Sequence, residues 1–254
     1  MDASAGEQGF DWRDGEAYAP LLGADRSLLA WEWLRRDGRY VEVATKALSA
    51  RMTTACPEEF GLVGFESPHL AVPRARPIWA AQVHPYVLFA ERRGDSGVSD
   101  GFDLERFGDV ATLAVHHQGE RLLLSDGLRT IRLDAPAGTF RHGRVCLRYR
   151  LEGIAAAKRP LLTLQRLLAL CRSGRFSHLL HPPERRARRW ILMLRALDAL
   201  EAGADQREIA RELLSPTAGE PRWRSREPSI RSQAQRLVRS VRLFSAGGYR
   251  ALLG

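Results

Sequence analysis

The residue types in this chain best suited to chemistry lie on one predicted helix near its C-terminal end, at about residues 229–244. Its apolar residues recur three and four positions apart, as in a helix that is buried along one side: Ile230, Ala234, Leu237, Val241 and Phe244. Its other side carries hydrogen-bonding side chains, namely Arg231, Ser232, Gln235, Arg236, Arg239 and Arg242. A guanidinium group can bind guanine through two hydrogen bonds, and a glutamine amide can bind adenine in the same way. The pattern therefore predicts an amphipathic helix whose exposed side can contact the edges of bases.

A shorter helix is predicted just before it, starting after Asp205. Asp205 and Glu208 have the spacing of a capping box, in which two side chains satisfy free backbone N–H groups at a helix start. Gln206 and Arg207, in the first turn of this helix, are further candidates for DNA contact. A short helix, a turn and a second helix with a basic side follow the order of a helix-turn-helix. The connector, residues 215–227, is longer than the usual turn, so we expect a variant or a winged form.

The connector itself is basic, with Arg222, Arg224 and Arg226 placed around Trp223. We expect these arginines to contact phosphates and so to hold the second helix against a duplex. Two other interpretations stay open at this point. The arginines of the second helix can form a solvated surface without a ligand, or the basic side can bind RNA or an acidic protein.

Charge is distributed unevenly along the chain. Residues 1–140 carry 15 Lys/Arg against 21 Asp/Glu, whereas residues 141–254 carry 24 against 9. The formal net charge of +9 therefore comes entirely from the C-terminal part. Phosphates supply the matching negative charge, and the counterions that they release favour binding. Nucleic acid is the favoured partner of residues 141–254, and a membrane surface or an acidic protein is the alternative.

The overall composition is that of a globular protein, with 44% hydrophobic and 27% charged residues. No stretch of the sequence approaches the roughly 18 apolar residues of a membrane span. The first residues lack the basic and apolar runs of a signal peptide. Three cysteines, an odd number, do not indicate a disulfide framework. We expect a cytoplasmic, nucleoid-associated protein that makes no membrane contact.

Patterns typical of catalysis or of cofactor binding are absent from the sequence. It contains neither a Walker loop nor the G-x-G-x-x-G glycine pattern, so nucleotide binding has no support. His178 and His181 precede a Pro-Pro pair without a nearby cysteine, which does not favour a metal site. We therefore expect no enzyme, no cofactor and no metal ion.

Hydrophobic periodicity divides the chain into three parts. Residues 1–75 are predicted to form an N-terminal helical module. Residues 76–152 contain short apolar or alternating runs separated by turn candidates, which predicts an antiparallel β-meander of about four or five strands, the first at 78–89. Residues 153–254 are predicted to be helical and to end in the helix-turn-helix-like domain. The expected fold class is α+β.

The C-terminal part also resembles a known family. The residues that carry the resemblance are 185–190, 198–210, Trp223, 229–232, 235–239 and 247–253. They are similar to the DNA-binding domain of RovC-like transcription factors, which are proteobacterial regulators of secretion-system genes and of the transfer of integrative and conjugative elements.

The N-terminal part resembles the regulator-like module that is found together with that domain. The matching residues are 11–13, Tyr18, 30–36, 60–62, 76–79 and 122–127. The resemblance implies a DNA-binding transcriptional activator of secretion-system or mobile-element transfer genes, and an oligomer. It does not fix the residues that contact bases, which we infer from helix geometry alone.

Three classes of function compete at this stage. The leading hypothesis is a sequence-specific activator that binds promoter DNA through its C-terminal domain, while its N-terminal half forms a homo-oligomer or contacts RNA polymerase. We place that self-association at Trp31 and Trp33, although Leu28, Trp31 and Leu34 share one helix face, which is typical of a core stripe. The second class is an adaptor or antiactivator-type module that binds an acidic protein. A nucleic-acid enzyme is disfavoured, because no clustered carboxylates or nucleophile are found.

Overall fold

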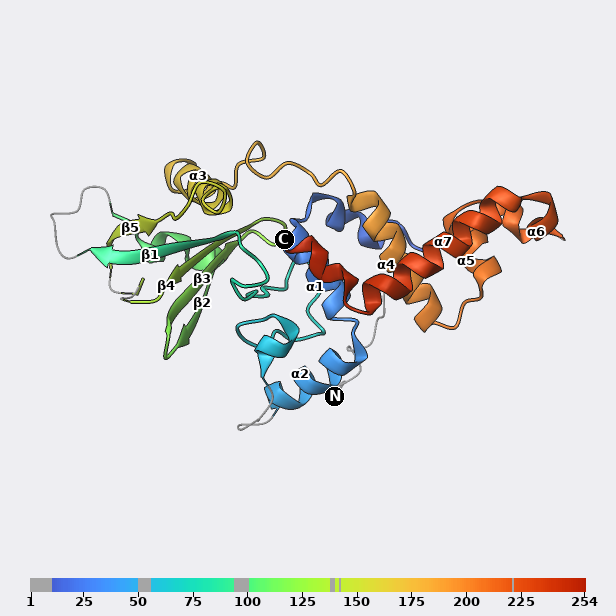
Figure 1. The fold of residues 1–254 in the computed structure, drawn as a ribbon, viewed down its shortest axis with the longest axis horizontal. Coiled ribbons are helices and arrows are strands. Elements are labelled where there is room, and N and C mark those ends of the chain that lie inside the picture. Colours follow the sequence, from blue (N-terminus) through green and yellow to red (C-terminus); the bar gives the residue numbers. More distant parts are fainter. Residues whose placement is uncertain (1–10, 50–55, 94–100, 138–139, 142, 221) are drawn as a thin grey trace, which may run out of the picture. The chain divides into compact units, whose positions relative to one another are not determined.

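The computed structural model describes residues 11–49, 56–93, 101–137, 140–141, 143–220 and 222–254, with the backbone alone at 223 and 224. Contacts within the chain divide it into two compact units, each described by itself. The helical unit contains the residues up to Leu22 together with Glu184–Tyr249, and the sheet unit contains Gly23–Pro183 together with Arg250–Gly254. Helices and a five-stranded sheet make up the described residues, which confirms the α+β class (Figure 1).

The helical unit is built around one long helix. Its elements are η1 (Glu16–Gly23), α4 (Ala187–Glu201), α5 (Gln206–Leu213), η4 (Pro216–Gly219), α6 (Trp223–Arg226) and α7 (Pro228–Ser245). Helices α4, α5 and α6 all contact α7 (Figure 1). Helix α7 thus has one side that packs against its neighbours, as the apolar stripe predicts.

The N-terminal segment belongs to this helical unit and not to the residues that follow it. Arg195 of α4 donates from Nε to the carbonyl oxygen of Trp12 at 2.9 Å and from Nη2 to that of Arg13 at 2.8 Å. The hydroxyl of Tyr18 donates to the carboxylate of Asp198, also on α4. The structure therefore groups the chain differently from the expected boundaries 1–75, 76–152 and 153–254, because these contacts tie the first described residues to α4.

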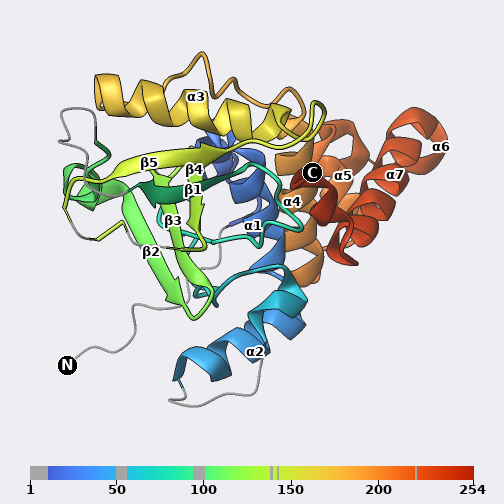
Figure 2. The ribbon, with the colours of Figure 1, turned by 60° about the vertical axis from the view of Figure 1, so that its left-hand side comes forward.

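The sheet unit contains strands β1 (Val87–Arg93), β2 (Ala111–His116), β3 (Gly119–Ser125), β4 (Thr130–Ala135) and β5 (Cys146–Arg150), in the spatial order β2-β3-β4-β1-β5. Strands β2, β3 and β4 form the predicted antiparallel meander. Strand β1 lies between β4 and β5, parallel to β4 and antiparallel to β5 (Figures 1 and 2). Hydrophobic alternation does not encode this parallel pair, because β1 meets a strand more than 40 positions later.

The first strand also starts later than predicted. The residues from Ile78 to Tyr86 do not continue β1, because His84 donates its backbone N–H back to Ala80 in a turn and Pro85 has no N–H to give to a ladder. Trp79 forms an isolated bridge with Leu62 instead. At the same end of the sheet, Gly127 closes the predicted turn between β3 and β4 with φ of 97°, and a Cβ there would lie 2.5 Å from the carbonyl oxygen of Pro73.

Two helices precede the sheet in the sequence, α1 (Arg26–Leu34) and α2 (Gly38–Ser49), followed by η2 (Pro57–Phe60). Leu28, Trp31 and Leu34 are fully buried, which confirms their stripe as core. Trp33 is buried as well. The expectation that Trp31 and Trp33 face a second copy of the chain is therefore wrong, because both indoles are already enclosed by their own unit.

Helix α3 (Lys158–Ser173) covers one face of the sheet over β1 and β4 (Figure 2). Its Leu167 and Leu170 join the sheet core, which also includes Leu88, Leu122 and Leu133. Segment η3 (Leu104–Val110) leads into β2 and contributes Phe107 to the same core.

The last residues of the chain return to the sheet unit. Arg250, within η5 (Gly248–Leu252), donates to the carbonyl oxygen of Glu59 at 3.0 Å. His84 Nδ1 lies 3.1 Å from the carbonyl oxygen of Leu253, which is buried. In the described part of the chain, no helix is long and apolar enough to cross a membrane.

Candidate nucleic-acid interface

Helix α7 has the two sides that the sequence predicts. Ala234, Leu237 and Val241 are buried, and Ile230 and Phe244 at the two ends of the stripe are half-buried. Successive helix residues are rotated by about 100°, so a stripe of this spacing leaves the opposite side free of contacts. The packed side fixes which residues of α7 face outward.

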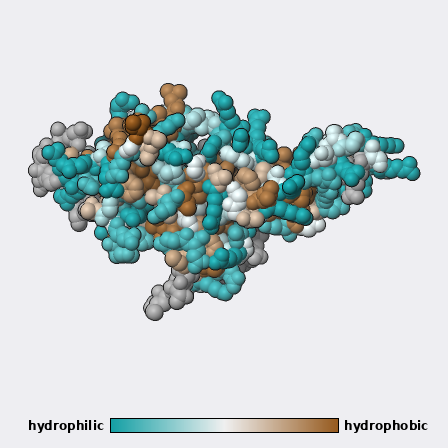
Figure 3. Space-filling view, viewed as in Figure 1, coloured by the Kyte–Doolittle hydropathy of each residue, from teal (hydrophilic) through white to brown (hydrophobic). Residues whose placement is uncertain are grey.

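The outward side carries the predicted candidates. Ser232 is half-buried, whereas the others are exposed: Arg231, Gln235, Arg236, Arg239 and Arg242. The four guanidinium groups have no hydrogen-bond or ion-pair partner among the described residues. Figure 3 shows the end of the helical unit that carries α6 and α7 as largely hydrophilic. The N–H donors of these four arginines are therefore available to a ligand.

Helix α5 begins as predicted, but only half of the expected capping box forms. Asp205 Oδ1 accepts from the N–H of Glu208 at 2.8 Å. The Glu208 carboxylate does not return to the N-cap; it lies 3.0 Å from Nη2 of Arg13. The N-terminal segment competes successfully for this carboxylate because a guanidinium donor is charged and a backbone N–H is not.

Of the two α5 candidates, Arg207 has a structural role. It donates from Nε to the carbonyl oxygen of Ala218 at 3.3 Å and from Nη2 to that of Gly219 at 2.5 Å. Arg207 thereby fixes η4 against α5, and part of its hydrogen-bonding capacity is used within the unit. Gln206 is half-buried at the start of the helix.

The connector between α5 and α7 is folded. Ala218 of η4 is buried with Ala210 and Ala234, against the partly buried Leu214 and Ile230. The connector contains η4 and α6, and its described residues include no strand. The described connector thus contains no strand of a wing, and the form of the helix-turn-helix stays a prediction.

The connector arginines differ in their environment. Arg222 is exposed and has a positive φ of 59°, a backbone conformation that is uncommon for residues other than glycine. Arg226 is also exposed and lies 3.8 Å from the Glu220 carboxylate. The side chains of Arg224 and Trp223 lie outside the described part of the chain.

A second basic cluster was not among the sequence candidates. Arg185, Arg186, Arg188 and Arg189, at the start of α4, are all exposed. Their guanidinium groups have no partner among the described residues, and the first turn of α4 contains no acidic residue. The start of a helix carries partial positive charge, so four arginines there repel it and favour a bound anion. The run of arginines in the sequence was the signal that could have identified this cluster.

Two family models match the chain in the order that the resemblance predicts. Residues 150–254 match the RovC DNA-binding domain, described as the DNA-binding domain of a type VI secretion system (T6SS) transcription factor. Residues 11–61 match a proteobacterial transcriptional regulator-like domain. No curated protein and no solved structure matches the chain. The matches confirm the resemblance over residues 11–61 and 150–254, whereas the expected matches at 76–79 and 122–127 lie outside both ranges. They support a DNA-binding transcriptional regulator with DNA as its partner.

Proposed function

We propose that this chain, a RovC-like DNA-binding transcriptional regulator, uses α7 as its recognition helix and activates secretion-system or mobile-element transfer genes. The proposal rests on the guanidinium groups of Arg231, Arg236, Arg239 and Arg242, which lie opposite the buried stripe and have no partner among the residues that the structure describes. Like charges along one helix repel each other, and phosphates and guanine acceptors relieve that repulsion.

The position along α7 suggests different roles for its residues. The N-terminal part of a recognition helix commonly meets base edges, and later residues meet the backbone of the duplex. We therefore assign base contact to Arg231 and Gln235, and phosphate contact to Arg242. The exposed arginines at the start of α4 and in the connector supply further phosphate contacts in this proposal.

Self-association and contact with RNA polymerase belong to the same proposal. One recognition helix covers a short site, and regulators gain site length and affinity by pairing. Since Trp31 and Trp33 are buried, the contact between copies has to use other residues. Light scattering on the full chain, with and without duplex, is expected to show more than a monomer; a strict monomer in both cases would contradict the oligomer.

The recognition role of α7 is tested by selecting a preferred site from random duplexes with the full chain. Arg231→Ala or Gln235→Ala should weaken binding to that site by about 1–3 kcal/mol and relax base preference, while random duplex is affected less. Gln233→Ala is the matched control, because Gln233 is an exposed glutamine of the same helix outside the proposed face. Thermal melting shows that each variant is folded.

The result separates the competing functions. If folded Arg231→Ala and Gln235→Ala proteins bind the selected site like the wild type, α7 is not the recognition helix, and Arg222, Arg224 and Arg226 become the better candidates. If the wild type selects no site and binds all duplexes alike, the adaptor that uses its basic helix against an acidic protein is favoured instead.

A further inference from the structure

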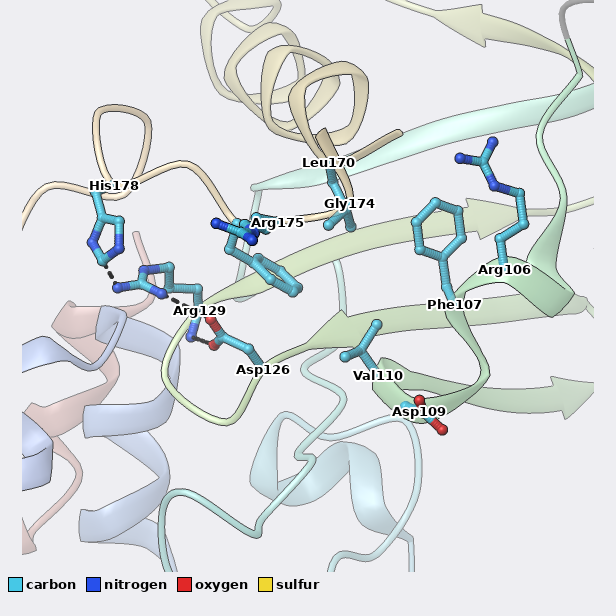
Figure 4. A pocket seen from close by; sticks show the side chains of 11 residues that line it. Arg106, Phe107, Asp109, Val110, Asp126, Arg129, Leu170, Gly174, Arg175 and His178 are labelled. Atoms are coloured by element: carbon cyan, nitrogen blue, oxygen red, sulfur yellow. Dashed lines mark hydrogen bonds and ion pairs between the residues drawn. The ribbon is translucent and has the colours of Figure 1, made fainter. Parts of the chain in front are cut away.

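The sheet unit contains a cavity of about 500 Å³ that the proposed DNA contact does not use. It lies between η3, the turn that joins β3 to β4, and the end of α3 with the residues after it (Figure 4). Its apolar lining consists of Phe107, Val110, Leu170 and Phe176. This volume is within the range of cavities that hold small molecules.

Positive and hydrogen-bonding groups gather at one side of this cavity, where Arg129, Arg175 and His178 lie close together (Figure 4). Arg129 donates from Nη2 to Nδ1 of His178 at 2.9 Å, so the Nε2 atom of the neutral imidazole carries the proton and is a further donor. Nε of Arg129 is buried and has no hydrogen-bond partner among the described residues. Because Nε is enclosed, Arg129 can offer a ligand only the second N–H groups of Nη1 and Nη2, whose first N–H groups are directed to Asp126 and His178.

Arg175 adds a second guanidinium group at the same side. Its side chain is exposed and has no partner in the described part of the chain. A third arginine of the lining, Arg106, is directed to the carbonyl oxygen of Cys171 at 3.4 Å. Arg129 and Arg175 are thus the groups best placed to receive an anion.

Two carboxylates also line the cavity. Asp126 is already engaged, since it lies 2.8 Å from Nη1 of Arg129 and accepts from the backbone N–H groups of Leu128 and Arg129. Asp109 lies at the side away from Arg129, Arg175 and His178 (Figure 4). Arg106 lies on that side as well, so a negative group there would meet one positive and one negative side chain (Figure 4).

We propose that this cavity binds a small organic anion with one carboxylate or phosphate group and an apolar ring. The anionic group lies against Arg129, Arg175 and His178, and the ring lies against Phe107, Val110 and Phe176.

Ligand-detected NMR on the full chain tests the site with benzoate and phenyl phosphate as probes. Both are expected to bind with a Kd of about 1 mM, a reasonable value for so small a ligand. Benzyl alcohol, which lacks the charge, should bind about tenfold more weakly or worse. This comparison tests the anion requirement.

Arg175→Glu should weaken the binding of benzoate and of phenyl phosphate by about tenfold or more. His178→Ala should weaken the binding of both probes to a smaller extent. Both side chains are exposed, and melting temperature checks that the variants fold. Arg172→Glu is the matched control, because Arg172 is an exposed arginine of α3 outside the cavity lining. The proposal would be overturned if neither benzoate nor phenyl phosphate binds, or if Arg175→Glu and Arg172→Glu weaken their binding equally. Duplex is absent from this experiment, so its outcome is independent of the DNA-binding proposal.

Discussion

The arginines beside Glu32 and Asp134 in the sheet unit and those on α7 in the helical unit have opposite surroundings. In the sheet unit, buried carboxylates hold them: Glu32 lies 2.8 Å from Nε of Arg35 and is also paired with Arg36, and Asp134 lies 3.1 Å from Nε of Arg121. On α7 of the helical unit, the exposed arginines have no carboxylate partner among the described residues. The same side chain thus stabilises the fold beside Glu32 and Asp134 and is left accessible to a ligand on α7.

The buried pairs show how neighbouring arginines change the pKa of a buried carboxylate. Burial alone would raise the pKa of Glu32, but the charges of Arg36 and Arg35 and the backbone N–H of Val72 hold this pKa below its ordinary value. The Glu32 carboxylate is therefore charged in the folded protein and fully engaged. Among the described residues of α7 no carboxylate compensates the arginines, and their exposed guanidinium groups remain accessible to a partner outside the chain.

The largest expected effect is on the buried pairs. Glu32→Ala leaves Arg35, Arg36 and the N–H of Val72 without their shared acceptor, so the free energy of unfolding should fall by about 3–5 kcal/mol. Urea unfolding followed by circular dichroism measures the loss. Glu42→Ala, which removes an exposed glutamate paired with Lys46, is the control and should leave stability nearly unchanged. If both substitutions lower the free energy of unfolding equally, the contacts of Glu32 with Arg35, Arg36 and the N–H of Val72 do not stabilise the fold.

The packed side of α7 comes next. Leu237→Ala removes a buried side chain and should destabilise the helical unit by about 2–5 kcal/mol. Leu243→Ala on the same helix is the matched control, because that side chain is 62% exposed. Thermal unfolding of the two variants measures the difference. Similar melting temperatures would contradict the orientation of α7 on which its basic side depends.

A pH-dependent stability should belong to the sheet unit. Burial is the main cause that lowers the pKa of His84 to about 4, although the carbonyl oxygen of Leu253 opposes the shift. Between the ordinary pKa of 6.5 and 4, the unfolded chain binds a proton that the folded chain does not. Stability is thus fully present above pH 6.5 and should fall by about 2–3 kcal/mol as the pH is lowered to 4.

Urea unfolding of the wild type and of His84→Gln at several pH values checks this expectation. The glutamine amide can still donate to Leu253 but does not titrate, so the loss between pH 6.5 and 4 should be smaller in the variant. The pKa values of Asp25 and Glu32 are also lowered, and their protonation destabilises the fold at still lower pH. An unchanged pH dependence in His84→Gln would assign the loss to other groups.

Local periodicity explains why much of α7 and of the β2-β3-β4 meander could be predicted from the sequence. The stripe that contains Leu237 and Val241 depends only on neighbours three and four positions away, and tight turns such as the one at Gly127 depend on the residues that form them. The same local reasoning placed Arg231 and Gln235 on the exposed side.

Long-range pairings could not be predicted in this way. His181 lies 3.1 Å from the Asp25 carboxylate although 156 positions separate them, and Tyr18 reaches Asp198 over 180 positions. The parallel pairing of β1 with β4 has the same origin, since it depends on tertiary packing. Arg207 shows the limit for the candidate site: its sequence position suggests a DNA contact, but its guanidinium group is directed to carbonyl oxygens of η4.

The smallest effect tests the unpartnered side of α7 directly. Arg242→Ala should weaken binding to all duplexes about equally, because a phosphate contact carries no sequence information. The slope of log K against log salt should become flatter by about one unit, since one fewer counterion is released. Salt titrations with the selected site and with random duplex measure both slopes, and Arg172→Ala in the sheet unit should change neither. A loss confined to the selected site would place Arg242 at a base edge, and an unchanged slope would mean that the last turns of α7 do not contact the duplex.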